Sequence, residues 1–191
     1  MIIGITGGTG SGKSTLLQLI ENQGGLVLDC DAIYHNLLQT DHNLLQSIEN
    51  AFPGTVIDGK LERKKLGAIV FNDEKALQKL NKITHAAVKA EVLRLLETKP
   101  ALAAIDAIGL FEGELDGLCD VTVAVIAPAE KRIARIMARD GISETYARDR
   151  IAAQHSDDWY RKQSDYILEN DGSFQDFQGK SLAFFRKIGI M

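Results

Sequence analysis

The sequence predicts an α/β fold with a parallel sheet, on two observations. Short apolar runs alternate along the chain with segments long enough to form crossover helices. The runs also lack strict alternation of apolar and polar residues, which is typical of strands buried on both faces. The predicted strands are Ile2–Thr6, Leu26–Asp29, Leu102–Ile108, Val121–Ile126 and Tyr166–Leu168.

Capping residues and periodicity mark the predicted helices. Gly24-Gly25 can end the first helix in a left-handed cap, Pro128 suits the first turn of a helix, and Ser143 can cap another. A long helix is predicted from about Asp73 to Glu97, because apolar residues recur on one face that we expect to pack on the core. That face consists of Leu77, Leu80, Thr84, Val88, Val92 and Leu95.

Size and composition favour one globular unit in the cytoplasm. The chain has 191 residues, of which 45% are hydrophobic, and no apolar run approaches the roughly 20 residues of a membrane helix. It enters the strand Ile2–Thr6 at once, so no secretory signal is expected. The net charge of -4 argues against binding to nucleic acid or to an anionic membrane. Cys30 and Cys119 lack metal-ligand spacing and are expected to be reduced, half-buried thiols.

The strongest local signal lies between the first predicted strand and helix. Gly7-Gly8-Thr9-Gly10-Ser11-Gly12-Lys13-Ser14 matches the phosphate-loop pattern G-x-x-x-x-G-K-[ST] at every fixed position. Glycines let consecutive N–H groups turn toward an anion, and the helix N-terminus adds partial positive charge. We expect Lys13 to reach the β- and γ-phosphates of a bound nucleotide, Ser14 to bind Mg²⁺, and Thr15 to lie near the α-phosphate.

Two other classes of phosphate-loop protein lack their own motifs here. A GTPase needs Asn-Lys-x-Asp, but the nearest match, Asn81-Lys82-Ile83-Thr84, has no aspartate and falls within a helical pattern. The Leu-Ser-Gly-Gly-Gln signature of transporter ATPases is absent from the sequence. A kinase acting on a small molecule is therefore the favoured class.

A pair of carboxylates, Asp29 and Asp31, ends the second predicted strand. Residues at the carboxyl end of a strand beside the phosphate-loop strand face the ligand crevice, where a carboxylate can accept the proton of an attacking hydroxyl. The alternative is that one or both aspartates cap the helix beginning near Ala32.

Several segments, in this order, resemble the dephospho-CoA kinase family over roughly residues 1 to 172. They are Ile5–Ser14, Asp29-Cys30-Asp31, Arg63–Phe71, Leu80–His85, Leu110-Phe111-Glu112, Arg139-Asp140-Gly141, Arg150–Gln154 and Asp165–Gly172. The resemblance implies a P-loop NTPase fold with a five-stranded parallel sheet, similar to nucleoside-monophosphate kinases. It also implies phosphorylation of the ribose 3′-hydroxyl of dephospho-CoA by ATP, the final step of coenzyme A biosynthesis.

The resemblance further implies three parts within one kinase domain, 1–191. The nucleotide core would be 1–31, 99–130 and 164–191. The helical CoA-binding lobe would be about 32–98, and the lid about 131–163. A monomer is expected.

The resemblance suggests residues for the acceptor site. Asp31 would be the general base beside the 3′-hydroxyl, and Arg63, His85 and Glu112 would bind the acceptor. For Arg63 the alternative is a solvated charge near a helix start, and for His85 it is a structural histidine.

The remaining site residues follow from position and resemblance. Asp106 lies within the apolar run Leu102–Ile108, where an acid could hold a Mg²⁺-bound water, or else it is a helix or turn cap at a strand end. Asn170, after the last strand, is expected near the adenine. Arg139 is expected to stabilise charge on the transferring phosphoryl group. Its neighbours Arg132 and Arg135, on the same helical face, are expected to be solvated or paired on the surface.

The sequence departs from the family pattern at three places. Ala86 follows His85 where proline is usual, Ile108-Gly109 stands where the family often has Pro-Leu, and Cys30 often corresponds to alanine. None of these changes removes a proposed chemical group. A kinase of a nucleoside or nucleotide is the nearest alternative, and a nucleotide-dependent switch without an acceptor is another.

Overall fold

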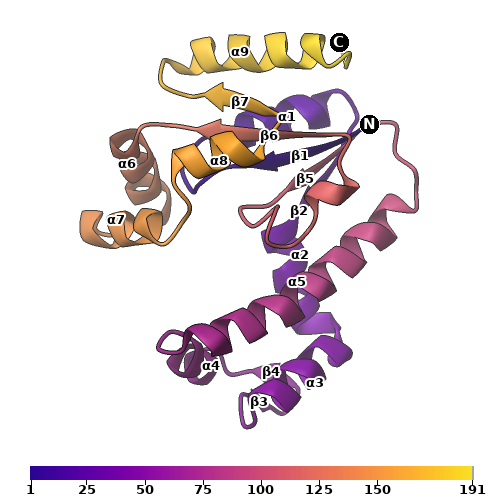
Figure 1. The fold of residues 1–191 in the computed structure, drawn as a ribbon, viewed down its shortest axis with the longest axis vertical. Helices are drawn as coiled ribbons and strands as arrows, with labels where there is room; N and C mark the ends of the chain where they lie inside the picture. Colours follow the sequence, from indigo (N-terminus) through magenta and orange to yellow (C-terminus); the bar gives the residue numbers. More distant parts are fainter. Residues whose placement is uncertain (191) are drawn as a thin grey trace. The chain divides into compact units, whose positions relative to one another are not determined.

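The computed structural model describes residues 1–190, so Met191, the last residue of the expected nucleotide core, lies outside the described residues. The described chain forms two compact units (Figure 1). The first comprises Met1–Val27, Pro100–Phe111 and the chain from Leu115 onward. The second comprises Leu28–Lys99 and the short segment Glu112–Glu114.

A five-stranded sheet organises the first unit, in the order β2-β5-β1-β6-β7. β1 pairs in parallel with β5 and β6, and β6 pairs in parallel with β7. The parallel sheet predicted from the sequence is therefore confirmed, with β5 shorter at both ends than expected. The bounds are β1 Ile2–Thr6, β2 Leu26–Asp29, β5 Ala103–Asp106, β6 Val121–Ile126 and β7 Tyr166–Glu169.

Helices cover both faces of this sheet. On one face Val123 and Val125 of β6 join a buried cluster with α1 and α9, while the alternate residues Ala124 and Ile126 pack with Tyr160 of α8. This alternation is the two-residue period of a pleated strand. The predicted caps at Gly24 (φ 74°) and Ser143 are confirmed. The helices of this unit are α1 Lys13–Asn22, α6 Ala129–Asp140, α7 Glu144–Ala152, α8 Asp157–Gln163 and α9 Phe174–Lys187, with a 3₁₀ turn at Asp116–Leu118.

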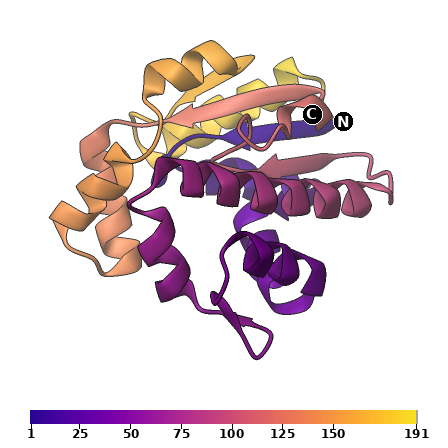
Figure 2. The same cartoon turned by 60° about the horizontal axis from the view of Figure 1, so that its bottom comes forward.

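The second unit is mainly helical, and α5 is its longest helix. Thr84, Val88 and Val92 of α5 are buried, as predicted, whereas Leu77 near its start is 38% exposed. The β3–β4 hairpin, which the sequence analysis does not predict, lies at the end of this unit away from α5 (Figure 2). The bounds are α2 Cys30–Thr40, α3 His42–Ala51, β3 Val56–Ile57, β4 Lys60–Leu61, α4 Arg63–Val70 and α5 Glu74–Leu96.

Aspartates set the helix boundaries in this unit. Asp41 accepts hydrogen bonds from the backbone N–H groups of Asn43 (2.8 Å) and Leu44 (3.1 Å), so a new helix begins where α2 ends. Asp73 caps α5 in the same way, with both bonds to N–H groups in its first turn. None of the helices in the described part of the chain is long and apolar enough to cross a bilayer.

Candidate functional site

The phosphate loop joins β1 to α1 in a conformation that requires glycine at three places. Gly7, Gly10 and Gly12 have φ values of 125°, 79° and 105°, in the region that side chains with a Cβ avoid. Gly12 is the N-cap of α1, so the free N–H groups of that helix open toward the loop. The predicted strand, loop and helix are therefore present in the order that a bound phosphate needs.

The carbonyl groups of the loop are held from outside by α6 and by Asn170. Arg132 Nε donates to Thr9 O at 2.9 Å, and Arg135 Nη1 donates to Gly10 O at 3.0 Å. Arg132 is only 5% exposed. The expectation that these two arginines are solvated or paired on the surface is therefore wrong, because the expected helix face packs against the loop.

Contacts also explain why glycine occupies positions 8 and 12. A Cβ on Gly8 would lie 2.1 Å from Nη2 of Arg132, and a Cβ on Gly12 would lie 2.2 Å from Nδ2 of Asn170. Either substitution would force the supporting side chain to move. Glycine at position 8 thus serves close packing rather than an unusual dihedral angle.

Lys13 lies over the strand ends beside the loop. Its Nζ donates to Gly7 O at 3.1 Å and lies 3.8 Å from Oδ1 of Asp106, the last residue of β5. Both side chains are largely buried, at 13% and 17% exposure. Ser14, one residue after Lys13, is exposed at the start of α1. The structure thus brings Lys13 and Asp106 together beside Gly7, the first residue of the phosphate loop.

Of the two strand-end carboxylates, Asp29 is a helix cap and Asp31 is not. Asp29 accepts a hydrogen bond from the N–H of Ala32 at 3.0 Å and is the N-cap of α2. Asp31 is exposed in the first turn of α2, and its carboxylate accepts no hydrogen bond from residues 1–190. Asp29 is therefore engaged in holding the helix, while Asp31 is available to a ligand.

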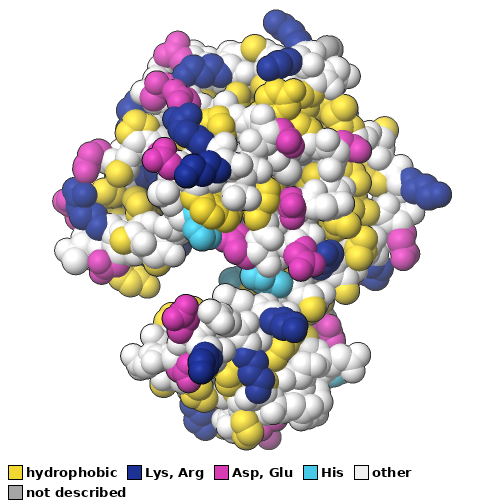
Figure 3. Space-filling view, viewed as in Figure 1, with side chains coloured by type: hydrophobic (Ala, Val, Ile, Leu, Met, Phe, Trp, Pro, Cys, Tyr) yellow, Lys and Arg dark blue, Asp and Glu magenta, His cyan; other side chains and the backbone are white. Residues whose placement is uncertain are grey.

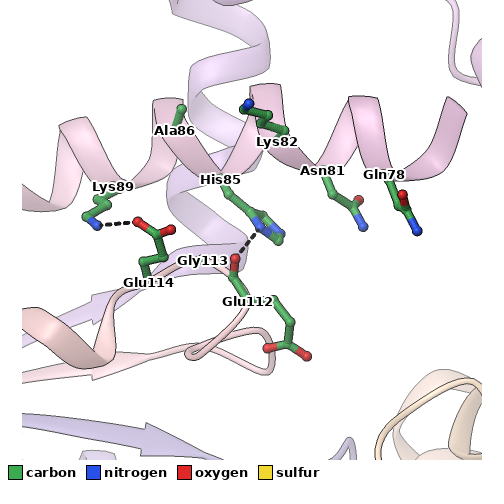
Figure 4. A pocket seen from close by; sticks show the side chains of 9 residues that line it. All are labelled: Gln78, Asn81, Lys82, His85, Ala86, Lys89, Glu112, Gly113 and Glu114. Atoms are coloured by element: carbon green, nitrogen blue, oxygen red, sulfur yellow. Dashed lines mark hydrogen bonds and ion pairs between the residues drawn. The ribbon is translucent and has the colours of Figure 1, made fainter. Parts of the chain in front are cut away.

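A cavity of about 480 Å³ in the second unit includes two of the expected acceptor residues. His85 Nδ1 lies 3.1 Å from the carbonyl oxygen of Glu112, and Lys89 pairs with Glu114 at 3.1 Å. These contacts hold the segment 112–114 against α5, as Figure 4 shows. Arg63 lines a different cavity, of about 520 Å³, beside the β3–β4 hairpin.

A family model described as dephospho-CoA kinase matches residues 1–176 of the chain. A dephospho-CoA kinase from Corynebacterium diphtheriae is 38% identical over 178 residues, which are 90% of this chain and 89% of that protein. The chain belongs to the dephospho-CoA kinase family. A solved structure from Thermus thermophilus, 34% identical, has a TM-score of 0.81 and covers 98% of this chain and 97% of its own. A dephospho-CoA kinase from Campylobacter jejuni, 26% identical, has a TM-score of 0.66 with 98% and 96% coverage.

As a member of the dephospho-CoA kinase family, the chain is an ATP-using kinase with the P-loop NTPase fold. The roles expected for the individual site residues remain predictions, among them that of Arg139. Arg139 pairs with the neighbouring Asp140 at 2.7 Å, and Asp140 also pairs with Arg150 at 2.6 Å. Hydrogen bonds from Arg139 and then from Arg150 lower the pKa of Asp140 to about 2. Arg139 would have to leave this exposed ion pair to reach a phosphate.

The side chain of Asn170 supports the phosphate loop. Its Nδ2 donates to Ser11 O at 2.8 Å, its Oδ1 accepts from Arg135 at 3.3 Å, and the residue is 4% exposed. Both polar atoms of the side chain are therefore used to hold the loop. Its proximity to the adenine stays a prediction.

The donor atoms at the loop fit a magnesium ion that is shared with ATP. Within residues 1–190 no cluster of three or more His, Cys, Asp or Glu side chains could hold a metal by itself. Mg²⁺ in kinases is usually bound by one or two protein oxygens together with substrate phosphates and water. The exposed hydroxyl of Ser14 and the carboxylate of Asp106, next to Lys13, match that kind of site.

Sequence reasoning missed Arg132, Arg135 and Gln154 as parts of the nucleotide site. The first two were recognised as sharing a helix face, and Gln154 ends a segment typical of the family. Nothing in the spacing distinguishes a face turned to solvent from one packed on a loop over 120 residues earlier. Other basic side chains of this unit form ion pairs, such as Arg161–Glu169 and Lys180–Asp171. Figure 3 shows Lys and Arg side chains (dark blue) and Asp and Glu side chains (magenta) interspersed on the face in view.

Proposed function

We propose that this chain transfers the γ-phosphoryl group of ATP to the ribose 3′-hydroxyl of dephospho-CoA, which gives CoA and ADP. Membership of the dephospho-CoA kinase family supports this reaction and its place as the final step of coenzyme A biosynthesis. The observation that carries the proposal is the phosphate loop, with Lys13 fixed beside Asp106 and the N-terminus of α1 open to an anion.

The transfer itself needs positioning and charge stabilisation more than covalent chemistry. The ATP site is formed by Gly8–Thr15 and Asn170, and Lys13 binds the β- and γ-phosphates. The 3′-oxygen attacks the γ-phosphorus, its proton passes to Asp31, and ADP leaves. The exposed carboxylate of Asp31, with no hydrogen-bond donor among residues 1–190, supports this role. Arg139 stabilises charge on the transferring group after it leaves Asp140.

The acceptor is bound by the helical lobe, about 32–98, together with the segment that carries Glu112. His85 and Glu112 share one cavity, which supports a common role in binding, and Arg63 contributes from the neighbouring one. The segment 131–163 acts as a lid that excludes water from the phosphoryl group. The protein is a cytoplasmic monomer that binds no nucleic acid.

A bound Mg²⁺ would neutralise phosphate charge, with Ser14 and Asp106 as the residues that hold it. Ser14 would supply its hydroxyl oxygen directly, and the Asp106 carboxylate would hold a metal-bound water. Nζ of Lys13 lies 3.8 Å from Oδ1 of Asp106, so the two side chains form an ion pair beside the loop.

The test is incubation of the purified protein with ATP, Mg²⁺ and dephospho-CoA, with products followed by mass. We expect equal amounts of CoA and ADP, and none of either without Mg²⁺. Lys13→Ala should abolish turnover, because the loop loses its only ammonium group. Lys75→Ala, which removes an exposed lysine of α5, is the matched control and should be fully active. Near-normal activity of Lys13→Ala would remove the phosphate-site assignment, and ATP binding without CoA formation would show that the acceptor is wrong.

A further inference from the structure

Thr9, in the first half of the phosphate loop, is held at three of its atoms by two side chains. Arg132 Nε donates to its carbonyl oxygen at 2.9 Å. Gln154 Oε1 accepts from its N–H at 3.0 Å, and Gln154 Nε2 donates to its Oγ1 at 2.7 Å. Arg132 Nη2 also donates to Gln154 Oε1 at 2.7 Å, so the two side chains support each other. Because both its N–H and its carbonyl group are held, the backbone angles φ and ψ of Thr9 are restricted.

Fixing Thr9 determines where the next N–H group points. In a planar trans peptide the carbonyl of one residue and the N–H of the following residue point in opposite directions. Because the Thr9 carbonyl is drawn outward to Arg132, the N–H of Gly10 is turned inward, to the side where phosphate binds. Asn170 does the same for the N–H of Gly12, through the carbonyl of Ser11. Arg135 holds the carbonyl of Gly10, while the N–H of Ser11 donates to Gly8 O at 3.1 Å within the loop.

Arg132 also places a positive charge directly behind the loop. The residue is 5% exposed, and the carboxylate nearest to its guanidinium is that of Asp157, at 3.9 Å. Its contact with Gly8 is so close that a Cβ there would lie 2.1 Å from Nη2. A buried guanidinium that is bonded to the loop backbone and only weakly neutralised favours an anion on the other side of that loop.

We propose that Arg132 is a positioning residue for ATP, which acts with Gln154 through Thr9 to hold the first half of the phosphate loop ready for the β- and γ-phosphates. Both side chains belong to the segment 131–163, so a movement of that segment changes the loop as well. The inference rests on the proposed function only for its kinetic assay, since ATP binding can be measured without an acceptor.

The first experiment compares Arg132→Gln and Arg132→Lys with wild type in steady-state CoA formation. Arg132→Gln loses the charge and the fork of donors, so we expect the KM for ATP to rise about tenfold or more. The KM for dephospho-CoA should stay within about twofold of wild type, since the residues proposed to bind the acceptor lie outside the phosphate loop. The KM for ATP of Arg132→Lys should lie between those of wild type and Arg132→Gln. Arg186→Gln is the control, because it removes an exposed arginine of α9, outside the segment 131–163.

An unchanged KM for ATP in folded Arg132→Gln, or an equal rise in both KM values, would overturn the proposal. If that variant does not fold, the same comparison is made with Arg132→Lys. Calorimetric binding of a non-hydrolysable ATP analogue repeats the test without an acceptor. A wild type that binds the analogue but makes no CoA would contradict the proposed function alone, and Arg132 would still be judged on the loss of analogue binding.

A double-mutant cycle tests the contact itself. Gly8→Ala should weaken ATP binding in wild type, because its Cβ meets Arg132. In an Arg132→Ser background only the contact with Oε1 of Gln154, at 2.8 Å from the added Cβ, remains. Adding Gly8→Ala there should therefore weaken binding of the ATP analogue by a smaller factor than in wild type. Full additivity of the two changes would show that Arg132 does not act on the loop at Gly8 and Thr9.

Discussion

Replacing Asn170 by alanine separates two roles for this residue, holding the loop and contacting the adenine. The substitution removes the 2.8 Å bond from Nδ2 to Ser11 O and the 3.3 Å bond from Arg135 to Oδ1. A neutral bond contributes about 1 kcal/mol and a charge-assisted one about 1.5 kcal/mol, so the free energy of unfolding should fall by about 2–3 kcal/mol. Ser11 O keeps its bond from Arg135 at 3.2 Å, so no carbonyl is left without a donor by this change.

The loss should be visible in both stability and phosphate binding. For a chain of this length we expect the melting temperature to fall by about 4–12 °C. If about half of the lost energy also holds the loop for phosphate, inhibition constants should rise about tenfold. Asn22→Ala is the control, since Asn22 is exposed and accepts a long bond, of 3.4 Å, from Gln18.

The deciding assay uses two competitive inhibitors against ATP. One is a non-hydrolysable ATP analogue, and the other is inorganic tripolyphosphate, which carries the phosphates without the base. If Asn170 acts through the loop, the inhibition constants of both should rise by the same factor in Asn170→Ala. A rise for the ATP analogue alone, with tripolyphosphate unchanged, would refute this reasoning and support a direct contact with adenine.

Two further predictions concern Asp31 and Cys119. Asp31→Asn should lower kcat by about 10²–10⁴-fold with little change in either KM, because a base acts only in the transition state. Steady-state kinetics with both substrates check this prediction. An effect on KM alone would make Asp31 a binding residue. Burial, and then the carboxylates of Asp116, Asp120 and Asp165, raise the pKa of the Cys119 thiol to about 12. The thiol is therefore protonated at pH 8 and should react with a thiol reagent far more slowly in the folded protein than in urea, whereas equal rates in the two states would contradict the burial.

The fold was predictable because its signals are local. Each predicted strand is a short apolar run between turn residues, and the alternation of strands and helices favours few arrangements other than a parallel sheet. The β3–β4 hairpin was not predictable in the same way. Each of its strands has only two residues, Val56–Ile57 and Lys60–Leu61, so no alternation can develop.

The phosphate loop was predictable at the level of its own backbone. Gly7 and Gly12 are the fixed glycines of the motif, and both have the positive φ values that favour glycine. Gly10, at a variable position of the motif, has a positive φ as well. The supporting side chains were not predictable. Arg132, Arg135 and Arg139 share one face of α6, yet the first two bond to the loop and the third pairs with Asp140.

The sequence by itself determined the sheet, the loop and the kind of chemistry, because dihedral preference, periodicity and motif depend on residues close together in the chain. The tertiary structure alone decided which arginines lie behind the loop, why glycine is needed at position 8, and which carboxylate of the pair Asp29 and Asp31 is left for a ligand. Those outcomes depend on the packing of segments more than 100 residues apart, such as Thr9 against Arg132, and on which of two neighbouring side chains satisfies a helix N-terminus. Burial and hydrogen-bond geometry at such contacts arise only when the chain has folded.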